Sequence, residues 1–249
     1  MFIKKNDQAR LNLLIANASA QGLKPQLISK HGLVALTIGG SERYIFYDNS
    51  NPNSQPSREL AKDKYATRIV MDRVGLPNIP YTVVSSTSEA ISFLEKHKTI
   101  IAKPIRGQKS KNIHLITAAK QLSNLDLGNC ILEKFIKGQE TRFLIVKGEV
   151  KAVHLKVYDS EINNPKTVKR ISIQQAAWDA SLSDVAKKAA EALGLIFCAV
   201  DFLVSGEGSF ILEINSAPGI DRFQNPDEGP PVDAMGLYLD TLASIHTKN

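Results

Sequence analysis

The chain has 249 residues and 43% of them are hydrophobic, which is enough for one large domain or for two lobes with their own cores. Its 31 basic and 25 acidic side chains give a formal net charge of +6, and no long run of lysine or arginine stands out. This scattered charge favours nucleotides or other small anionic ligands over nucleic acid. Cys130 and Cys198 lie in apolar runs, so we expect neither a disulfide framework nor a thiolate metal site.

The N-terminal stretch is superficially similar to a secretory signal, because Lys4 and Lys5 precede a series of apolar residues. Asn12 and Asn17 interrupt that series, however, and its apolar side chains fall at helical spacing on one face. Gly22 is well placed to end such a helix. We therefore predict an amphipathic core helix, and we expect no transmembrane segment and a cytoplasmic location.

Short β-rich runs separated by turn residues follow this helix, at residues 24–29, 32–38 and 42–48. The segment after them, 49–57, contains Pro52 and Pro56, which is typical of a linker. We therefore predict a small helix and hairpin unit over residues 1–57.

Helical spacing of apolar residues predicts one helix over 58–74, closed by Gly75 and Pro77. Ser86 and Glu89 form a candidate capping box for a second helix. The remaining pattern predicts a strand at residues 81–84 and places that helix at 88–97. It also predicts a hairpin of two strands at residues 99–105 and 112–116.

A second half of similar character begins near residue 129. Its strand patterns lie at residues 129–136, 140–146, 149–157, 169–173, 198–204 and 209–215. Lys147 and Gly148 indicate a tight turn. We predict a helix over 181–195, capped by Ser181 or Ser183 and ended by Gly194, and a last helix around 232–246. The expected fold class is α+β, with two lobes of mostly antiparallel sheet and helices on one side.

The hairpin formed by the last two strands carries the sharpest chemical signal. If its turn is centred on Glu207, Asp201 and Glu213 face each other across the two strands, and Asn215 shares the face of Glu213. Three oxygen ligands on one face suit one or two Mg²⁺ ions bound to a polyphosphate. An ordinary solvent-facing hairpin remains the alternative for this motif taken alone.

Two lysines are candidates for binding phosphate. Lys103 ends an apolar strand, and Lys64 lies in the first predicted helix of this half. The loop 106–112, which includes Gly107, is able to fold over phosphates through its backbone N–H groups and cations. Each lysine is also compatible with a solvated surface position, and the loop with an ordinary hairpin turn.

The segment around residues 133–140 has the form of a strand that leads into a connector. Backbone groups of Glu133, Lys134, Phe135 and Ile136 are candidates for pairing with an adenine edge, and Glu140 is a candidate for the ribose hydroxyls. None of the five histidines has metal-ligand spacing, so we expect them to be structural or surface residues.

Taken in order, DKYATR, IIAKPI, ILEKFIKGQE, AVDFLV and ILEINSAPG resemble the ATP-grasp superfamily over residues 58–249. The segment 57–84, preceded by a hairpin unit, is similar to the ATP-grasp part of cyanophycin synthetases and bifunctional glutathione synthetases. The resemblance to D-alanine–D-alanine ligases and ribosomal-protein glutamate ligases is more distant. The resemblance to the superfamily implies an ATP-grasp fold in which ATP binds between two lobes. We expect these lobes over residues 58–133 and 134–249.

The resemblance also implies an activity, that of an ATP-dependent carboxylate–amine ligase that works through an acyl phosphate. It implies ATP and Mg²⁺ as cofactors and assigns the same roles as above: phosphate contacts, adenine and ribose contacts, and metal ligands. Lys156 stands where relatives carry an arginine, and Lys156 and Arg170 are the expected cations for the substrate carboxylate. Asn215, with the SAPG sequence that follows it, favours ligase chemistry by the same resemblance.

The sequence departs from the family pattern in three places. The loop 107–112 keeps only Gly107 of the usual glycines, so closure over ATP is expected to rely on Lys109 and Lys111. The substrate loop is shortened to 158–170, and no full-sized domain precedes the ATP-grasp core. We expect a homodimer, a partner protein or a carrier-borne substrate to complete the substrate site.

Two alternatives to a ligase stay open. The same fold also hosts kinases, and a nucleotide-binding module without turnover fits the shortened loop. The expected substrate is an amino acid, a peptide or a polymer end, with no membrane or nucleic-acid partner. No dinucleotide-binding G-x-G-x-x-G motif follows a strand, which disfavours oxidoreductases.

Overall fold

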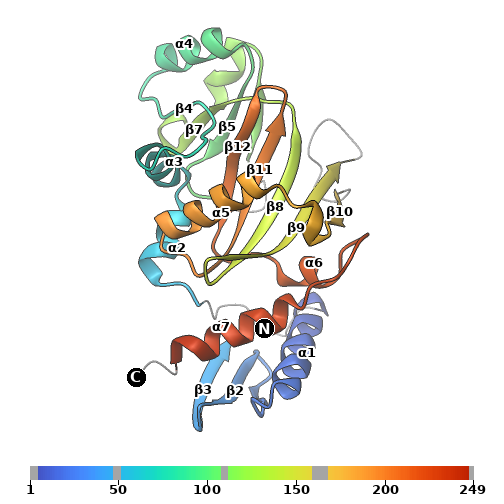
Figure 1. Cartoon of the computed structure of the whole chain (residues 1–249). Helices are drawn as coiled ribbons and strands as arrows, with labels where there is room; N and C mark the ends of the chain where they lie inside the picture. The colour runs from blue at the N-terminus through green and yellow to red at the C-terminus, as the bar shows by residue number, and fades with distance from the viewer. Residues whose placement is uncertain (1–4, 47–51, 108–111, 159–167, 247–249) are drawn as a thin grey trace.

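The computed structural model describes residues 5–46, 52–107, 112–158 and 168–246. The chain forms three antiparallel sheets that follow one another along the long axis of the molecule (Figure 1). A three-stranded sheet lies at the end that holds both termini, a five-stranded sheet lies in the middle, and a four-stranded sheet lies at the far end. This architecture confirms the expected class of mostly antiparallel sheets with helices.

The N-terminal unit consists of a helix packed on a small sheet. Its elements are α1 (Lys5–Ala20), β1 (Gln26–Ser29), β2 (Leu33–Ile38) and β3 (Ser41–Phe46), with strand order β1-β2-β3. The predicted helix is confirmed: Leu11, Leu14 and Ala18 are buried, and Gly22 has a positive φ of 73° just beyond its end. Gly39 and Gly40, both with positive φ, form the two-residue turn between β2 and β3.

The four-stranded sheet belongs to the next segment and has the order β4-β7-β5-β6. The elements of this segment are α2 (Gln55–Lys62), α3 (Lys64–Arg73), β4 (Tyr81–Thr82), α4 (Thr87–His97), β5 (Ile100–Pro104), β6 (His114–Ile116), the 3-10 helices η1 (Ala119–Asn124) and η2 (Leu127–Asn129), and β7 (Cys130–Lys134). The expected hairpin of β5 and β6 is confirmed, since Ile100 pairs with Ile116.

The single helix predicted over 58–74 is wrong, because the chain breaks at Asp63. The backbone of Asp63 is extended, and its carboxylate accepts a hydrogen bond from the amide of Ala66 at 2.9 Å, so it ends α2 and caps α3. Leu60 and Ile69, two of the apolar residues whose spacing indicated the single helix, are each 37% exposed. Arg68 is buried in the same helix and only 3% exposed.

The five-stranded sheet is the largest and has the order β10-β9-β8-β11-β12. Its segment contains β8 (Gln139–Val146), β9 (Glu149–Tyr158), β10 (Val168–Ser172), the 3-10 helix η3 (Gln175–Ala177), α5 (Ala180–Ala192), β11 (Phe197–Ser205), β12 (Gly208–Asn215), α6 (Ile220–Gln224) and α7 (Ala234–His246). Helix α5 covers one face of this sheet (Figure 1). Its N-cap is Asp179, whose carboxylate accepts from the amide of Leu182 at 3.0 Å, rather than Ser181 or Ser183.

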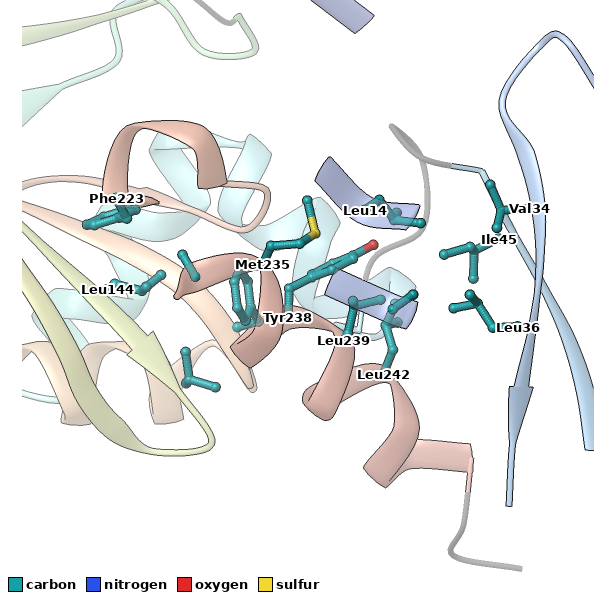
Figure 2. Packing of buried hydrophobic residues seen from close by; sticks show 14 of the residues in the cluster. Leu14, Val34, Leu36, Ile45, Leu144, Phe223, Met235, Tyr238, Leu239 and Leu242 are labelled. Atoms are coloured by element: carbon teal, nitrogen blue, oxygen red, sulfur yellow. The ribbon is translucent and has the colours of Figure 1, made fainter. Parts of the chain in front are cut away.

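A shared apolar core attaches the N-terminal unit to the rest of the chain. Helix α7 lies between the three-stranded and five-stranded sheets, with Leu239 and Leu242 toward the N-terminal sheet and Leu144 of β8 beyond Tyr238 (Figure 2). Asn53, in the predicted linker, is also buried and donates to the carbonyl oxygen of Phe197 at 2.7 Å. The described part of that linker is therefore held against the sheet. The domain limits at residues 57 and 133 stay a prediction.

None of the helices in the described ranges is long and apolar enough to cross a lipid bilayer.

Candidate functional site

A row of charged side chains crosses the face of the five-stranded sheet opposite α5. Arg142, Asp201 and Glu213 stand directly opposite one another on β8, β11 and β12. Residues paired in an antiparallel ladder point to the same face, so these three side chains are neighbours. In the adjoining row, Arg170 pairs with Lys156 and Lys156 pairs with Glu140.

The expected pairing of Asp201 with Glu213 is confirmed, although for a reason that the sequence did not contain. The hairpin turn begins from the pair Ser205 and Gly208, and continuing that regular register would place Leu212 opposite Asp201. A β-bulge at Leu212 adds one residue to β12 and moves Glu213 into that place.

Asp201 is buried and held by two cations. Its carboxylate accepts from Nε and Nη2 of Arg142 at 2.7 and 2.5 Å, and Nζ of Lys156 lies 3.1 Å from Oδ1. Burial alone would raise the pKa of Asp201, but Arg142 and Lys156 outweigh this effect and lower it to about 2. Asp201 is therefore ionised at neutral pH and available as an oxygen ligand.

The donor set fits Mg²⁺. Asp201, Glu213 and Asn215 offer oxygen atoms on one face, and the described residues give the exposed Glu213 carboxylate no hydrogen bond or ion pair. Asn215 Oδ1 accepts from the amide of Ala217 at 2.9 Å, which leaves a second lone pair on that oxygen. No cage of three His, Cys, Asp or Glu side chains is found in the described ranges, and Mg²⁺ bound through carboxylates and phosphate oxygens needs none.

The two candidate phosphate lysines lie near this candidate metal face. Lys103 is only 7% exposed, and its Nζ lies 2.6 Å from Oε2 of Glu133. Lys64, at the start of α3, donates to the carbonyl oxygen of Gly107 at 3.1 Å. The pKa of Lys64 is lowered, first by burial and also by Lys103, while Glu213 acts in the opposite direction. The fold thus brings Lys64, Lys103 and Glu213 together from three separate segments.

The candidate phosphate loop is described at residues 106–107 and 112 only. Lys109 and Lys111, expected to assist closure over ATP, lie outside the described residues. Arg106 at the start of the loop contacts Glu59 and Asp63, at 2.9 and 3.3 Å.

The segment expected to bind adenine has two of its backbone donors already engaged. The amide of Lys134 donates to Pro80 and that of Phe135 to Thr99, at 2.8 and 3.0 Å, so neither is available to a base. Ile136 is buried in a small apolar cluster beside the segment expected to bind adenine. Its other members are Ile79, Leu203, Phe210 and Leu212.

The candidate ribose ligand Glu140 and the candidate carboxylate-binding Lys156 contact each other. Nζ of Lys156 lies 3.0 Å from Oε2 of Glu140 and also contacts Asp201. Tyr158 is hydrogen-bonded to Glu140, and its pKa is raised by burial first and then by that carboxylate. Two protein carboxylates therefore already match the charge of Lys156.

Arg170 lies beside two further arginines. Its Nη1 donates to the carbonyl oxygen of Val168 at 3.1 Å. The pKa of Arg170 is lowered by burial and then by the like charges of Arg222 and Arg142. Such a crowded group of guanidinium ions is relieved when an anion binds.

The ATP-grasp domain family matches residues 61–219 of this chain. The chain belongs to the ATP-grasp family. Proteins of this family use ATP, and the charged face described above lies within the matched residues.

Two relatives in the same family are ligases by name. The chain is 26% identical over 178 residues to the tetrahydromethanopterin:alpha-L-glutamate ligase of Methanocaldococcus jannaschii, which covers 64% of this chain and 60% of that protein. It is 27% identical over 190 residues to a probable alpha-L-glutamate ligase of Coxiella burnetii, which covers 70% of this chain and 61% of that protein. The chain therefore spans about 60% of the length of these relatives.

Solved structures show the same fold. A bifunctional glutathione synthetase from Pasteurella multocida superposes with a TM-score of 0.69 at 14% identity, over 96% of this chain and 44% of that one. This superposition includes the N-terminal unit. The ATP-grasp ligase PsnB bound to a minimal precursor superposes with a TM-score of 0.62 at 18% identity, over 78% of this chain and 63% of that one. PsnB has also been solved with Mg and ADP.

Sequence reasoning missed several residues of this ATP-grasp site. Arg68 binds Glu133 and Arg142 binds Asp201, while the charge of Arg222 acts on Arg170. Each of these partners lies far away in the sequence, so no local pattern indicates the contact. His154 is 1% exposed, its ring lies 4.5 Å from that of Phe223, and its Nε2 has no hydrogen-bond partner among the described residues. Only the period-two alternation of β8 and β9 hinted that Arg142 and His154 face inward.

Proposed function

We propose that this chain is an ATP-dependent carboxylate–amine ligase. It transfers the γ-phosphoryl group of ATP to a carboxylate and releases ADP, and an amine then attacks the acyl carbon, so that an amide forms and phosphate and a proton leave. The observation that carries the proposal is the convergence of Asp201, Glu213, Lys64 and Lys103 on one face of an ATP-grasp fold. The glutamate ligases among the relatives support it.

The proposed nucleotide site uses the residues expected from the sequence. Lys64 and Lys103 would contact the phosphates and Glu140 the ribose. The adenine edge would pair with backbone groups of residues 133–136 other than the engaged amides of Lys134 and Phe135, beside the apolar cluster around Ile136. One or two Mg²⁺ ions would be held by Asp201, Glu213 and Asn215. When bound, Mg²⁺ supplies positive charge to the polyphosphate. Lys103 and Lys64 add fixed positive charge to the transferring group.

The substrate carboxylate is proposed to bind at the arginine group. Arg170 is the better of the two expected cations, because Lys156 is matched by Glu140 and Asp201. Arg142 and Arg222 add positive charge beside Arg170. The negative charge that develops on the acyl carbon's oxygen during amine attack would be stabilised by the same cations. By likeness to the named relatives, one proposed substrate is an amino acid such as glutamate. A substrate of peptide type is proposed by likeness to PsnB, which has been solved with a precursor peptide.

Trapping with hydroxylamine tests the proposal. The chain is incubated with ATP, Mg²⁺, hydroxylamine and a panel of amino acids, short peptides and acidic polymers. An acyl phosphate is a mixed anhydride, so a ligase should yield a hydroxamate in step with ADP. A stable phosphate ester without hydroxamate would instead identify a kinase, and bound ATP without either product would identify a binding module.

A homodimer or partner that completes the site stays a prediction. Sedimentation of the chain with and without ATP tests the dimer.

A further inference from the structure

Arg68 is an arginine buried between the four-stranded and five-stranded sheets, and its guanidinium group donates four hydrogen bonds. Nε donates to Oε1 of Glu133 at 3.0 Å, and Nη2 lies 3.0 Å from the same oxygen in an ion pair. Nη1 donates to Oδ1 of Asn78 at 2.8 Å. The other two bonds run from Nη1 and Nη2 to the carbonyl oxygens of Ile211 and Leu212, at 2.5 and 2.9 Å. Arg68 lies on α3, whereas both carbonyls lie on β12.

Those two carbonyl groups belong to the β-bulge. Phe202 pairs with Ile211 and Asp201 pairs with Glu213, so Leu212 is the extra residue on β12. Strand β12 is an edge of its sheet, and Ile211 turns its backbone outward there: its amide donates to Pro77 at 3.0 Å and its carbonyl oxygen accepts from Arg68. The carbonyl oxygen of Leu212, the extra residue of the bulge, also accepts from Arg68, so Arg68 ties the outer edge of β12 at the bulge itself.

The bulge decides the face to which Glu213 points. In a regular ladder continued from the turn, Leu212 would stand opposite Asp201, and Glu213 would point into the core beneath α5. With the bulge, Ile211 and Ile214 both pack in that core, and Glu213 joins Asp201 on the opposite face. With the one-residue bulge, Glu213 stands beside Asp201 on the candidate metal face. Without it, the Glu213 carboxylate would be buried alone in the apolar core.

The other side of Arg68 leads to the phosphate lysine. Glu133 is 2% exposed, and it binds Arg68 through Oε1 and Lys103 through Oε2. Arg68 and Lys103 together hold the pKa of Glu133 below its usual value against the effect of burial. One continuous set of contacts therefore joins Lys103, Glu133 and Arg68 to the bulge in β12.

We propose that Arg68 is a positioning residue: it holds the bulge at Leu212 and thereby keeps Glu213 opposite Asp201 as a metal ligand, in register with Lys103. This role rests on the proposed function for its Mg²⁺–ATP site, but Arg68 itself touches neither ATP nor metal.

The first test uses Arg68→Lys, which keeps the positive charge beside Glu133 but lacks the planar fork that reaches both carbonyls. Calorimetry measures ATP affinity with and without Mg²⁺, and amide hydrogen exchange of β12 is followed in the protein without ligand. We expect the gain in affinity on adding Mg²⁺ to fall about tenfold, the metal-free affinity to change by less than about threefold, and the β12 amides near Leu212 to exchange faster. Arg73→Lys, an exposed position on the same helix, is the control.

A second test removes the need for Arg68. In Arg68→Met with Leu212 deleted, β12 regains a regular ladder in which Glu213 still faces Asp201, so Mg²⁺-dependent ATP binding should return toward the wild-type value. A double variant that fails to fold or to recover this binding overturns the proposal, as does Arg68→Lys with unchanged Mg²⁺ dependence and exchange.

The two proposals fail in different ways. A wild-type chain that binds Mg²⁺–ATP but forms no hydroxamate refutes the ligase activity and leaves the role of Arg68 standing. A wild-type chain whose ATP affinity ignores Mg²⁺ overturns both the metal assignment and that role.

Discussion

At the scale of single residues, the candidate phosphate and carboxylate cations all have protein oxygen partners. Lys103 contacts Glu133, Lys64 contacts the Gly107 carbonyl, and Lys156 contacts two carboxylates. A ligand with several negative charges must therefore replace or share these partners. The proposed Mg²⁺ would likewise have to displace or share the partners of Asp201, because the ion competes with Arg142 and Lys156 for the same carboxylate.

Glu213 provides the most direct prediction for the metal face. Glu213→Gln removes the negative charge of an exposed carboxylate while keeping its shape, so Mg²⁺-dependent ATP binding should weaken by about tenfold or more. Titration calorimetry at fixed Mg²⁺ measures this change, and the melting temperature should stay near that of wild type. Glu149→Gln, exposed at the start of β9, is the matched control. Unaltered binding in Glu213→Gln would remove this residue from the metal site.

Arg170 provides the prediction for the acid substrate. A charge-assisted hydrogen bond contributes about 1.5–3 kcal/mol, so Arg170→Ala should raise the half-saturating acid concentration in the hydroxamate assay by about ten- to a hundredfold. ATP affinity should be unaffected. Lys169→Ala is the control, because Lys169 lies on the opposite face of the same strand and forms an ion pair with Glu228. Its acid dependence should match that of wild type. Equal acid dependence in the Arg170 variant and wild type would place the carboxylate elsewhere.

His154 makes stability depend on pH. Its pKa is lowered to about 4, by burial first and then by Arg142 and Arg170, whereas an unfolded histidine titrates near about 6.5. Between these values the unfolded chain binds the extra proton, so stability is lost as pH falls through this window. From pH 7 to pH 5 the loss should be on the order of 2 kcal/mol.

Urea unfolding at both pH values measures this loss. His154→Leu should lack it, and His114→Leu, at an exposed position on β6, should keep it. Asp201 does not interfere, because its lowered pKa confines its own contribution to lower pH, where stability falls between its unfolded pKa and about 2. Identical pH dependence in His154→Leu and wild type would contradict a neutral buried histidine.

At the scale of elements, local signals predicted hairpins well and helix breaks poorly. The turns at Gly39–Gly40 and Lys147–Gly148 were evident because positive φ favours a few residue types. The break at Asp63 was not, since its apolar neighbours keep helical spacing on both sides. The burial of Arg68 on α3 was also not predicted, because its four acceptor atoms come from distant parts of the chain or from the loop after the helix.

The cap of α5 provides a prediction at this scale. Asp179→Ala removes the acceptor for the Leu182 amide and should destabilise the chain by about 1 kcal/mol. The helix lies on the face opposite the charged row, so ATP affinity should not change. Ser181→Ala, at an exposed position of the first turn, should have little effect on the urea midpoint. A larger loss in Ser181→Ala than in Asp179→Ala would reverse the assignment of the cap.

At the scale of the whole molecule, the order of motifs predicted the ATP-grasp fold. A turn assumed to be centred on Glu207 led to the correct Asp201–Glu213 pair, but the bulge at Leu212 that produces this pair was not predicted. Contacts between strands distant in the sequence could not be predicted. The pairing of β8 with β11, which places Arg142 opposite Asp201, has no local signal in the sequence. The docking of the N-terminal unit was equally hidden. Its apolar helix face predicts burial but does not say that α7, about 220 residues later, provides the partner surface.

This shared core predicts that the N-terminal unit and the five-stranded sheet unfold together. Leu239 is fully buried on α7 between them (Figure 2), and Leu239→Ala should cost about 2–5 kcal/mol. Trp178, the single tryptophan, packs against the core beneath α5, so its fluorescence reports the sheet rather than the mutated region. In urea, its transition in Leu239→Ala should shift together with that of the far-ultraviolet signal, because loss of one core destabilises both parts. A tryptophan transition that stays at the wild-type midpoint would show that the two parts unfold independently.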